Sequence, residues 1–465
     1  MPDPDSGRTT SRHAPSAPRA AHDPYAALRV RNYRDFMIGG FLSSFGRQAV
    51  SIAIGWQIYE WTNSATALGL MGLINVIPLI ALSLPAGLLA DRCDRKRIIS
   101  LGAAGAAACS LLLGLLALGH DWMPHCAPLD WGNRALLRIA LVFEKQVASG
   151  GLNFTDPELP LIYLVLFIQA IIRMLTWPAR ASILPLLLPK EKLSNAIMWN
   201  STTFETATVA GPALGGFIVA WFGFASVYFL DAAIGLLFFA LLLRVRYLNK
   251  PEPANETRSL RTMLAGAQFI WRKKVILGAG TLDLFAVLLG AITELLPVFA
   301  KEILHTGPIG LGWLRAAPSV GAVGMALWQA HRRPWRRPGA AMLWAVAGFG
   351  AAITTFGLSQ NYALSLAALL LTGVCDNVSV VVRQSLIQLL TPDRLRGRVT
   401  GVNQVFIGSS NEIGALRGGI MVALLGPVAA VTLGGAGTVA VVLLVAWLVP
   451  DLRRLKPLDT LKPEE

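Results

Sequence analysis

The chain has 465 residues, of which 54% are hydrophobic and only 15% are charged, and its formal net charge is +14. Soluble domains carry about 25% charged residues, so a chain this long and this apolar is expected to lie in a membrane. The basic residues stand between long apolar runs, which is typical of membrane topology, so we expect no nucleic-acid partner. The four cysteines have no spacing typical of a metal site or a disulfide framework.

Twelve apolar runs are long enough to cross a bilayer, for which a helix needs about 20 residues. They cover residues 36–58, 66–90, 98–119, 159–182, 204–222, 225–243, 275–299, 309–330, 340–358, 362–388, 399–424 and 428–449. The shortest joints between runs lie near Gly223 and Gly426. An even number of spans places both termini on one side of the membrane. Residues 1–25, which lack an apolar core, are expected to form a disordered cytoplasmic tail.

The lysines and arginines support this topology. If the N-terminus is cytoplasmic, the 41 Lys and Arg residues fall mostly in the cytoplasmic joints and tails. The opposite side holds only Arg134, Arg138, Lys145 and Lys301. Cytoplasmic joints carry the excess of Lys and Arg in membrane proteins, so both termini are predicted to be cytoplasmic.

The longest cytoplasmic joint, residues 244–274, divides the chain into two sets of six spans. We expect an N-terminal six-helix bundle over 26–243, a cytoplasmic linker over 244–274 and a C-terminal six-helix bundle over 275–449. A cytoplasmic tail follows over 450–465. The external loop 120–158 is much longer than the others, and its aromatic residues suggest a short helix at the membrane surface.

The two halves contain a repeat. An offset of 203 residues aligns spans 4 and 5 with spans 10 and 11 without a gap. The matched positions are Arg180 with Arg383, Ser182 with Ser385, Pro189 with Pro392, Asn200 with Asn403, Gly211 with Gly414 and Gly223 with Gly426, among others. Chance matches of Leu and Gly in apolar sequence are the alternative, but they do not explain spaced Arg, Pro and Asn matches in one register. Parallel halves of this kind occur in transporters, with the substrate site near the midplane between them.

The joint between spans 2 and 3 reads Gly87-Leu-Leu-Ala-Asp91-Arg92-Cys-Asp94-Arg95-Lys96-Arg97. A basic cytoplasmic loop explains the four basic residues, but not the glycine and aspartate ahead of them. The segment resembles the G-x-x-x-D-R-x-x-R-[RK] signature of the major facilitator superfamily, except that Asp94 stands where glycine is common. The resemblance implies an all-α membrane protein with twelve transmembrane helices in two pseudo-symmetric six-helix bundles. It also implies a gating latch made by Gly87, Asp91, Arg92, Arg95, Lys96 and Arg97.

Span 5 contains Gly211, Pro212, Gly215 and Gly216. This segment resembles the glycine–proline motif of exporters and antiporters in the superfamily, although it lacks the earlier glycines of the full motif. A kinked packing helix is the alternative interpretation, and both can hold. Other segments resemble the branch that contains enterobactin (siderophore) exporters, namely Asn32-Tyr33-Arg34, Leu295-Leu296-Pro297-Val298-Phe299 and Ser410-Asn411-Glu412. That branch combines siderophore exporters with drug and metabolite exporters.

Ionisable residues at membrane depth are costly and usually face a cavity or a partner. The candidates for substrate or proton binding are Arg47, Gln48, Gln169, Arg173, Asp283, Glu294, Asp376, Arg383 and Glu412. A carboxyl group in a low dielectric binds its proton more tightly than in water, so Glu412, Asp376 or Asp283 is the predicted coupling site. Arg47 and Arg173 are the predicted substrate contacts. Each residue could instead belong to a structural ion pair, and for Arg180 and Arg383 snorkelling or a latch role is favoured.

These features predict a secondary active transporter that exports a small organic molecule by proton antiport with alternating access. A siderophore-like substrate is favoured, because a catecholate siderophore is anionic and aromatic. The alternative is a broad-specificity drug or metabolite exporter, and uptake also stays open because a fold fixes no direction. The sequence has neither metal-spaced ligands nor a phosphate-binding glycine loop, so we expect no enzyme and no cofactor. The expected setting is the bacterial inner membrane, as a monomer with protons, lipid and a small molecule as partners.

Overall fold

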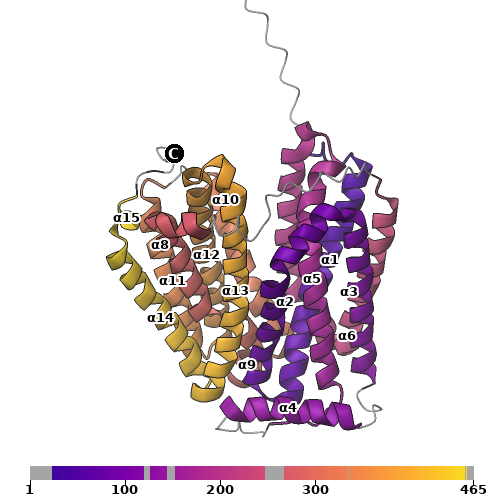
Figure 1. Cartoon of the computed structure of the whole chain (residues 1–465). Helices are drawn as coiled ribbons and strands as arrows, with labels where there is room; N and C mark the ends of the chain where they lie inside the picture. Colours follow the sequence, from indigo (N-terminus) through magenta and orange to yellow (C-terminus); the bar gives the residue numbers. More distant parts are fainter. Residues whose placement is uncertain are drawn as a thin grey trace, which may run out of the picture.

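The computed structural model describes residues 23–119, 126–143, 152–246, 267–332, 335–455 and 457, and the elements in these ranges are helices (Figure 1). The long helices are α1 (Arg31–Thr62), α2 (Ala65–Arg92), α3 (Arg95–Leu118), α4 (Ala127–Phe143), α5 (Leu159–Leu187), α6 (Leu193–Arg244), α8 (Lys274–Gly290), α10 (Gly307–Ala330), α11 (Pro338–Leu358), α12 (Tyr362–Leu390), α13 (Asp393–Leu425) and α14 (Pro427–Leu448). Short pieces are η1 (Lys190–Lys192), η3 (Thr293–Leu295), α9 (Leu296–Val298), η4 (Phe299–Ile303) and α15 (Pro450–Arg453). Nearly all of the predicted N-terminal tail, residues 247–266 of the predicted linker and most of the C-terminal tail lie outside the described residues.

The described helices account for twelve membrane spans. Eight are long and apolar enough to cross a membrane by length and composition. One of these, α6, has 52 residues, about 78 Å of helix, which is far more than one bilayer crossing requires. It therefore supplies two spans. The other three spans are α1, α10 and α13, which have spanning length but include more polar residues.

Two glycines make the sharpest joints. Gly223 breaks α6 with φ 79°, and Gly426 separates α13 from α14 with φ 81°. With ψ near 170° in both, this is a backbone region that essentially only glycine enters. The two glycines are also partners in the 203-residue repeat, so the two halves turn at equivalent positions by the same means.

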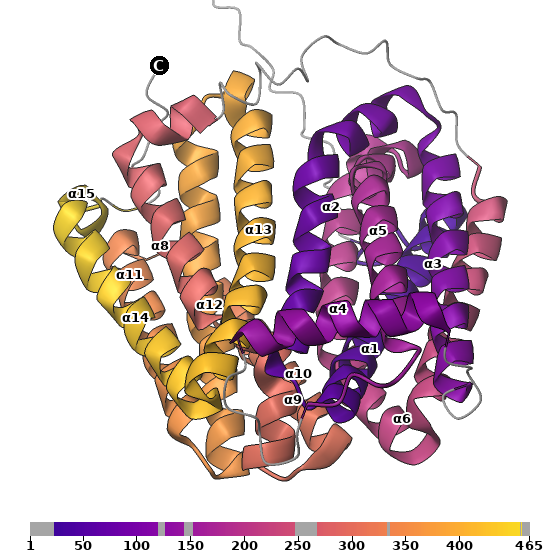
Figure 2. The same ribbon diagram turned by 60° about the horizontal axis from the view of Figure 1, so that its bottom comes forward.

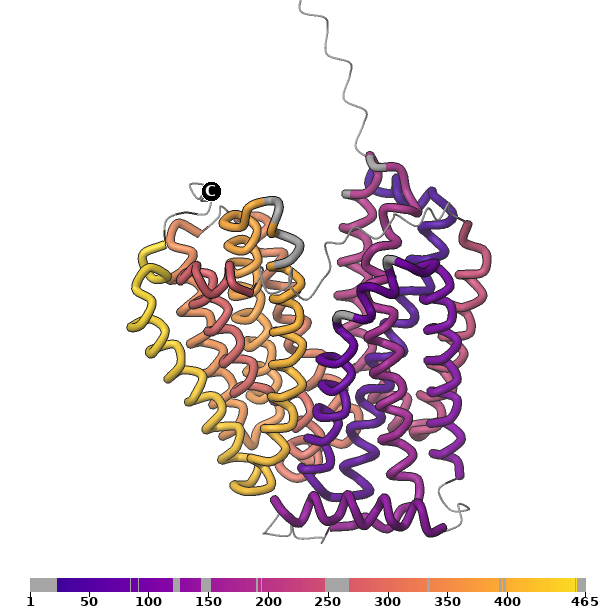
Figure 3. The backbone as a smooth tube through the Cα atoms, in the orientation of Figure 1, coloured from indigo at the N-terminus to yellow at the C-terminus, as the bar shows by residue number. Residues whose placement is uncertain are grey.

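Two helical bundles stand side by side (Figure 1). The N-bundle contains α1, α2, α3, α5 and α6, and the C-bundle contains α8 to α14. The main contacts between the bundles are α2 with α13 and α6 with α10. The two backbones lie close together at the end covered by α4 and diverge toward the opposite end, where the described residues begin and end (Figure 3). We call these ends the α4 end and the termini end.

The seventh span is broken. α8 ends at Gly290, and η3, α9 and the π-helix η4 continue in the same direction as short pieces. Pro297 contributes to the break, because proline has no amide hydrogen to donate. The broken part packs against α1, α10 and α13. It therefore places its polar side chains where the two bundles meet.

The long loop after α3 contains the helix α4, which lies across one end of the molecule (Figure 2). α4 contacts α5 and α2 of the N-bundle and α13 of the C-bundle. Its buried Asn133 donates from Nδ2 to the carbonyl of Asp156 over 2.8 Å, while Trp131 is exposed. α4 thus touches both bundles on the predicted external side.

Candidate functional site

The predicted gating motif begins at the joint between α2 and α3. The Asp94 carboxylate caps α3 by accepting a hydrogen bond from the Lys96 backbone N–H over 2.8 Å. The Lys96 ammonium group donates to the carbonyls of Val245 and Leu243, over 2.8 and 3.2 Å, at the end of α6. A cation at the C-terminal carbonyls of a helix is favourable. Lys96 therefore fastens α3 to the end of α6 within the N-bundle.

Two further basic residues of the motif also have partners within the N-bundle. Arg95 donates to the Ser182 carbonyl of α5 over 3.2 Å, and Arg97 lies 4.0 Å from the Asp94 carboxylate. Gly87 and Arg92 belong to the last turns of α2. The Asp91 side chain lies outside the described part of the chain, so its latch role stays a prediction.

The first two glycines of the predicted exporter motif face α1. A Cβ on Gly215 would lie 2.8 Å from the Cα of Ala49, and a Cβ on Gly211 would lie 2.6 Å from the Cβ of Gln48. Real Cβ atoms are essentially never this close. α6 and α1 can therefore pack at this distance only because these positions are glycine. Gln48, a predicted substrate or proton residue, is part of this helix contact.

The other two motif residues face the opposite bundle. Gly216 packs against the carbonyl of Pro308, and a Cβ on Gly312 of α10 would lie 2.7 Å from the carbonyl oxygen of Pro212. The motif thus brings α6 of the N-bundle against α10 of the C-bundle. This contact belongs to the surface along which the bundles must separate if the α4 end opens.

An ion pair joins the bundles at their interface. Arg173 of α5 donates to Glu412 of α13 over 3.3 Å and to the side-chain oxygen of Asn75 in α2 over 3.4 Å. The Arg173 side chain is 49% exposed and that of Glu412 is 21% exposed. The sequence predicted both residues as site candidates, and the fold brings them together.

A second cross-bundle contact lies near the first. Arg315 of α10 pairs with Glu294 of the broken span over 3.2 Å and donates to the Ser51 hydroxyl of α1 over 2.7 Å. Glu294 is close enough to Glu412 for their charges to interact. Sequence reasoning missed Arg315 as a site residue, although an arginine inside an apolar run was a visible signal. We call Arg173, Glu412, Asn75, Arg315, Glu294 and Ser51 the central cluster.

Arg47 and Gln169 lie within the N-bundle near a third polar group. Asp231 of α6 accepts from the Ser110 hydroxyl over 2.6 Å, and Gln169 donates to the same hydroxyl over 3.5 Å. The Asp231 carboxylate packs against Gly46, beside the exposed Arg47, which donates to the Ser44 hydroxyl of its own helix. Asp231 and Ser110 were not among the predicted site residues.

The remaining candidates form a group in the C-bundle, in which Asp283 and Arg383 are buried and Asp376 is half-buried. Asp283 of α8 and Arg383 of α12 form an ion pair at 3.2 Å with side chains 7% and 4% exposed. Arg383 also donates to Asn403 of α13 over 3.2 Å. Snorkelling is therefore the wrong interpretation for Arg383, because α12 continues to Leu390 and its guanidinium points to partners inside the bundle.

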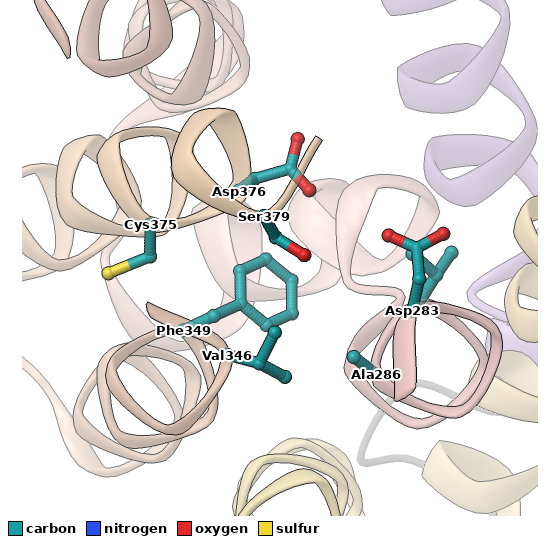
Figure 4. Close-up of a pocket in the computed structure, with 8 residues that line it drawn as sticks. Asp283, Ala286, Val346, Phe349, Cys375, Asp376 and Ser379 are labelled. Atoms are coloured by element: carbon teal, nitrogen blue, oxygen red, sulfur yellow. The ribbon is translucent and has the colours of Figure 1, made fainter. Parts of the chain in front are cut away.

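Asp283 and Asp376 line one small pocket with Ser379, Cys375, Val346 and Phe349 (Figure 4). Its volume is about 10 Å³, roughly the minimum that one water molecule needs. A siderophore or a drug does not fit such a space. Three of the predicted candidates, Arg173, Glu294 and Glu412, thus lie at the interface, where an organic molecule could reach them. Arg47, Gln48 and Gln169 lie in the N-bundle, and Asp283, Asp376 and Arg383 lie at or beside the small pocket of the C-bundle.

Comparison with known proteins identifies the family. The family model described as Major Facilitator Superfamily matches residues 36–338 and 332–464. The chain belongs to the major facilitator superfamily. Two similar curated proteins are named enterobactin exporter EntS, from Citrobacter koseri at 27% identity and from Escherichia coli at 26%. Each alignment covers 91% of this chain and 93% of the relative.

Solved structures show the same fold. A bacterial homologue of the iron transporter ferroportin in an inward-facing state matches with a TM-score of 0.65 at 16% identity, over 92% of this chain and 99% of that one. A bacterial homologue of the lysosomal transporter Spinster, inward-facing and unoccupied, matches with a TM-score of 0.63 at 16% identity, over 92% and 97%. The chain is thus a multi-pass membrane transporter of the major facilitator fold.

In this major facilitator transporter, polar contacts also join the bundles at the α4 end. The Tyr59 hydroxyl at the end of α1 donates to the Glu302 carboxylate in η4. The neighbouring Lys301 donates to the Asn63 side chain over 2.9 Å, and its ammonium group lies 5.3 Å from the centroid of the Tyr59 ring. None of these residues was predicted as a site residue. They join the ends of spans 1 and 7, where the ribbons are closest.

The two halves of the transporter carry opposite charges at equivalent positions. The 203-residue offset that aligns Arg180 with Arg383 also aligns Arg173 with Asp376 and Thr176 with Ser379. Arg173 reaches the opposite bundle, whereas Asp376 lines the pocket inside its own bundle. The repeat therefore supplies a cationic position at the interface of the bundles and an anionic position at the pocket inside the C-bundle.

Proposed function

We propose that this transporter exports a small anionic organic molecule, siderophore-like in chemistry, by proton antiport with alternating access. It acts as a monomer in a bacterial inner membrane, with both termini cytoplasmic. The two enterobactin exporter relatives support export and this substrate class. The close glycine contacts of α6 with α1 and α10 support the resemblance to the exporter motif.

The observation that carries the proposal is the Arg173–Glu412 ion pair. It crosses between the bundles, and both side chains are partly exposed. A carboxylate or catecholate oxygen can replace Glu412 as the partner of Arg173, because a guanidinium group binds any such oxygen in the same fork geometry. Binding of an anion would then release the link between α5 and α13. A substrate that replaces Glu412 would thus couple its own binding to separation of the bundles.

A broad-specificity drug or metabolite exporter is the second candidate. The central cluster also offers two carboxylates, Glu294 and Glu412, which would suit a lipophilic cation. In that case the arginines would hold the carboxylates in the empty state, and the cation would displace the arginines. The two candidates differ in which member of each ion pair binds the substrate.

Efflux from intact cells and uptake into inverted vesicles test the proposal, with a catecholate siderophore and a lipophilic cationic dye as parallel probes. We expect siderophore transport that a protonophore abolishes, with no transport in cells that lack the protein. Dye transport without siderophore transport would support the second candidate. Siderophore transport that a protonophore leaves intact would refute proton antiport.

A further inference from the structure

We infer that Asp376, together with Asp283, Arg383 and Ser379, forms the proton-binding site of this transporter. The site lies inside the C-bundle and is separate from the central cluster that would meet the substrate. The inference rests on the proposed function in one respect, namely that a proton drives transport. It goes further in naming the group that carries the proton.

The charges of the described residues around the pocket do not balance. Asp283 and Arg383 form a buried pair with no net charge. Asp376 adds a second carboxylate to the same pocket, and a single arginine cannot neutralise two carboxylates. An uncompensated charge in a low dielectric costs many kcal/mol, so such a group takes up a proton or a cation instead. The described residues therefore leave the pocket one positive charge short.

The elements packed against α12 do not supply that charge. α8 contributes Asp283, and α11 contributes the apolar Val346 and Phe349. α10 contributes Gln329, a neutral side chain that donates to Asn377. α13 contributes Asn403, which binds Arg383. On α12 itself, Cys375 and Arg383 are the other titratable or charged groups beside Asp376.

Two other arginines of the helices packed against α12 have partners elsewhere. Arg417 of α13 donates to the Leu289 carbonyl of α8. Arg315 of α10 is bound to Glu294 and Ser51 in the central cluster. Among the described residues, Arg383 is thus the one cation that faces both carboxylates of the pocket. A proton on Asp376 restores neutrality without any movement of these side chains.

The pocket also contains a buried hydroxyl for which the described residues offer no hydrogen-bond partner. Ser379 is 3% exposed, and its oxygen finds no partner among the described residues. The hydroxyl stands on the same face of α12 as Asp376 and lines the same pocket (Figure 4). A buried polar atom of this kind normally bonds to protein or to an ordered water. One water in the pocket would satisfy Ser379 and connect the carboxyl groups for proton transfer.

The size of the pocket favours a proton over a larger ligand. A space for about one water excludes an organic substrate. Sodium ions prefer several oxygen ligands, whereas Val346 and Phe349 cover one side of this pocket with carbon atoms. A proton requires only the carboxylate itself. We therefore infer that the pocket binds a proton rather than a metal cation.

The proposed proton site is connected to the two segments that carry Glu412 and Glu294, the carboxylates of the central cluster. Arg383 binds Asn403 on α13, and the same helix carries Glu412. Asp283 lies on α8, which runs directly into the broken segment with Glu294. When Asp376 loses its proton, its charge competes with Asp283 for Arg383. The competition changes how α12 holds α8 and α13, and so affects both ion pairs of the central cluster.

Infrared difference spectroscopy on the purified full-length protein in lipid nanodiscs tests this inference. The measurement follows the carbonyl band of a protonated carboxyl group as the pH rises from mildly acidic to mildly alkaline, with no substrate present. We expect the wild-type protein to lose one buried-carboxyl band on alkalinisation. D376N should lack this band, and D376E should restore it at a shifted frequency. E412Q is the matched control and should retain the band.

Several outcomes would overturn the inference: a full band in D376N, loss of the band in E412Q instead, or removal of the band by sodium at constant pH. Elution of each variant as a single peak on size exclusion shows that it is folded, and D376E provides the folded comparison if D376N aggregates. Because no substrate is present, failure here is distinct from failure of the proposed function. The latter would appear as wild-type efflux that ignores a protonophore.

Discussion

The two ion pairs in which both residues were predicted, Arg173–Glu412 and Arg383–Asp283, contribute differently to stability. Arg173 is half exposed, and ion pairs in such surroundings contribute only about 0–1 kcal/mol to stability. Arg383 and Asp283 are almost fully buried, and removing one partner of a buried pair costs about 3–5 kcal/mol. The exposed pair can therefore break and form again during transport, whereas the buried pair holds α8 and α12 together.

Replacement of Arg173 by alanine should affect transport much more than stability. Loss of a charge-assisted hydrogen bond to an anionic substrate costs about 1.5–3 kcal/mol, so siderophore efflux should fall about tenfold or more. Stability should change by about 1 kcal/mol at most. Initial efflux rates and thermal unfolding of the purified protein measure the two quantities.

The control is R29A, which removes a surface arginine that pairs with Asp23 far from the central cluster. It should leave efflux unchanged. Normal siderophore efflux by R173A would contradict the substrate role of this residue. A large loss of thermal stability in R173A would instead mean that the ion pair is structural.

The sequence predicted which residues were unusual, but not which would pair. Arg173, Glu412, Asp283 and Arg383 were all found because a charge inside an apolar run is costly. Their partners depend on how helices far apart in the chain are arranged, since Glu412 follows Arg173 by 239 residues. Ser51 and Asn75 were missed because a neutral polar residue in a span is common and carries no distinctive signal.

At the scale of helices, close contacts between backbones form the interface of the bundles. Gly312 of α10 lies against Pro212 and Ala213 of α6, and Gly69 of α2 lies against Gly419 of α13. Small residues let helices approach closely in membranes. Such contacts are purely steric, so they can separate without leaving a buried charge behind. They suit a surface that opens and closes in each transport cycle.

Replacement of Gly312 by alanine should weaken closure of the α4 end. The new Cβ would lie 2.7 Å from the Pro212 carbonyl oxygen, and overpacking of this kind costs about 1–3 kcal/mol. Only the state with a closed α4 end contains this contact. The equilibrium between the closed and open states of the α4 end should therefore shift about tenfold or more toward the open state. Spin labels at Leu118→Cys and Leu358→Cys, in a background without native cysteines, report the distance between the bundles.

The matched control is G324A on the same helix, where a Cβ would meet nothing within 4 Å. It should give the wild-type distance distribution. We expect a longer-distance population in G312A only. Identical distributions in G312A and G324A would mean that the α6–α10 contact does not limit opening.

The element boundaries were more predictable than the site. The two shortest predicted joints, near Gly223 and Gly426, both fall at glycines whose backbone angles essentially only glycine adopts. Composition revealed them because a positive φ there requires glycine. The broken seventh span was predicted as one continuous run over 275–299, since hydrophobicity does not distinguish an intact helix from one interrupted at Ala291 and Pro297.

At the scale of the whole molecule, polar contacts hold the α4 end together while the bundles diverge at the termini end. Tyr59, Lys301 and Glu302 lie at the α4 end, and α4 itself contacts helices of both bundles there. If the termini are cytoplasmic, as the distribution of lysines and arginines predicts, this arrangement is closed to the outside. The solved relatives with the same fold include inward-facing states.

Two native cysteines can determine this orientation. Cys93 is exposed at the joint between α2 and α3, near the termini end, and Cys126 is exposed directly before α4 at the other end. The predicted topology places Cys126 outside and Cys93 in the cytoplasm. A membrane-impermeant maleimide should therefore label Cys126 in spheroplasts and Cys93 in inverted vesicles. Variants C93S and C126S assign each signal to its residue, and buried Cys109 should stay unlabelled in both.

The opposite labelling pattern would reverse the predicted topology, and the closed α4 end would then face the cytoplasm. The labelling result therefore decides whether the central cluster opens toward the cytoplasm or toward the outside in this structure.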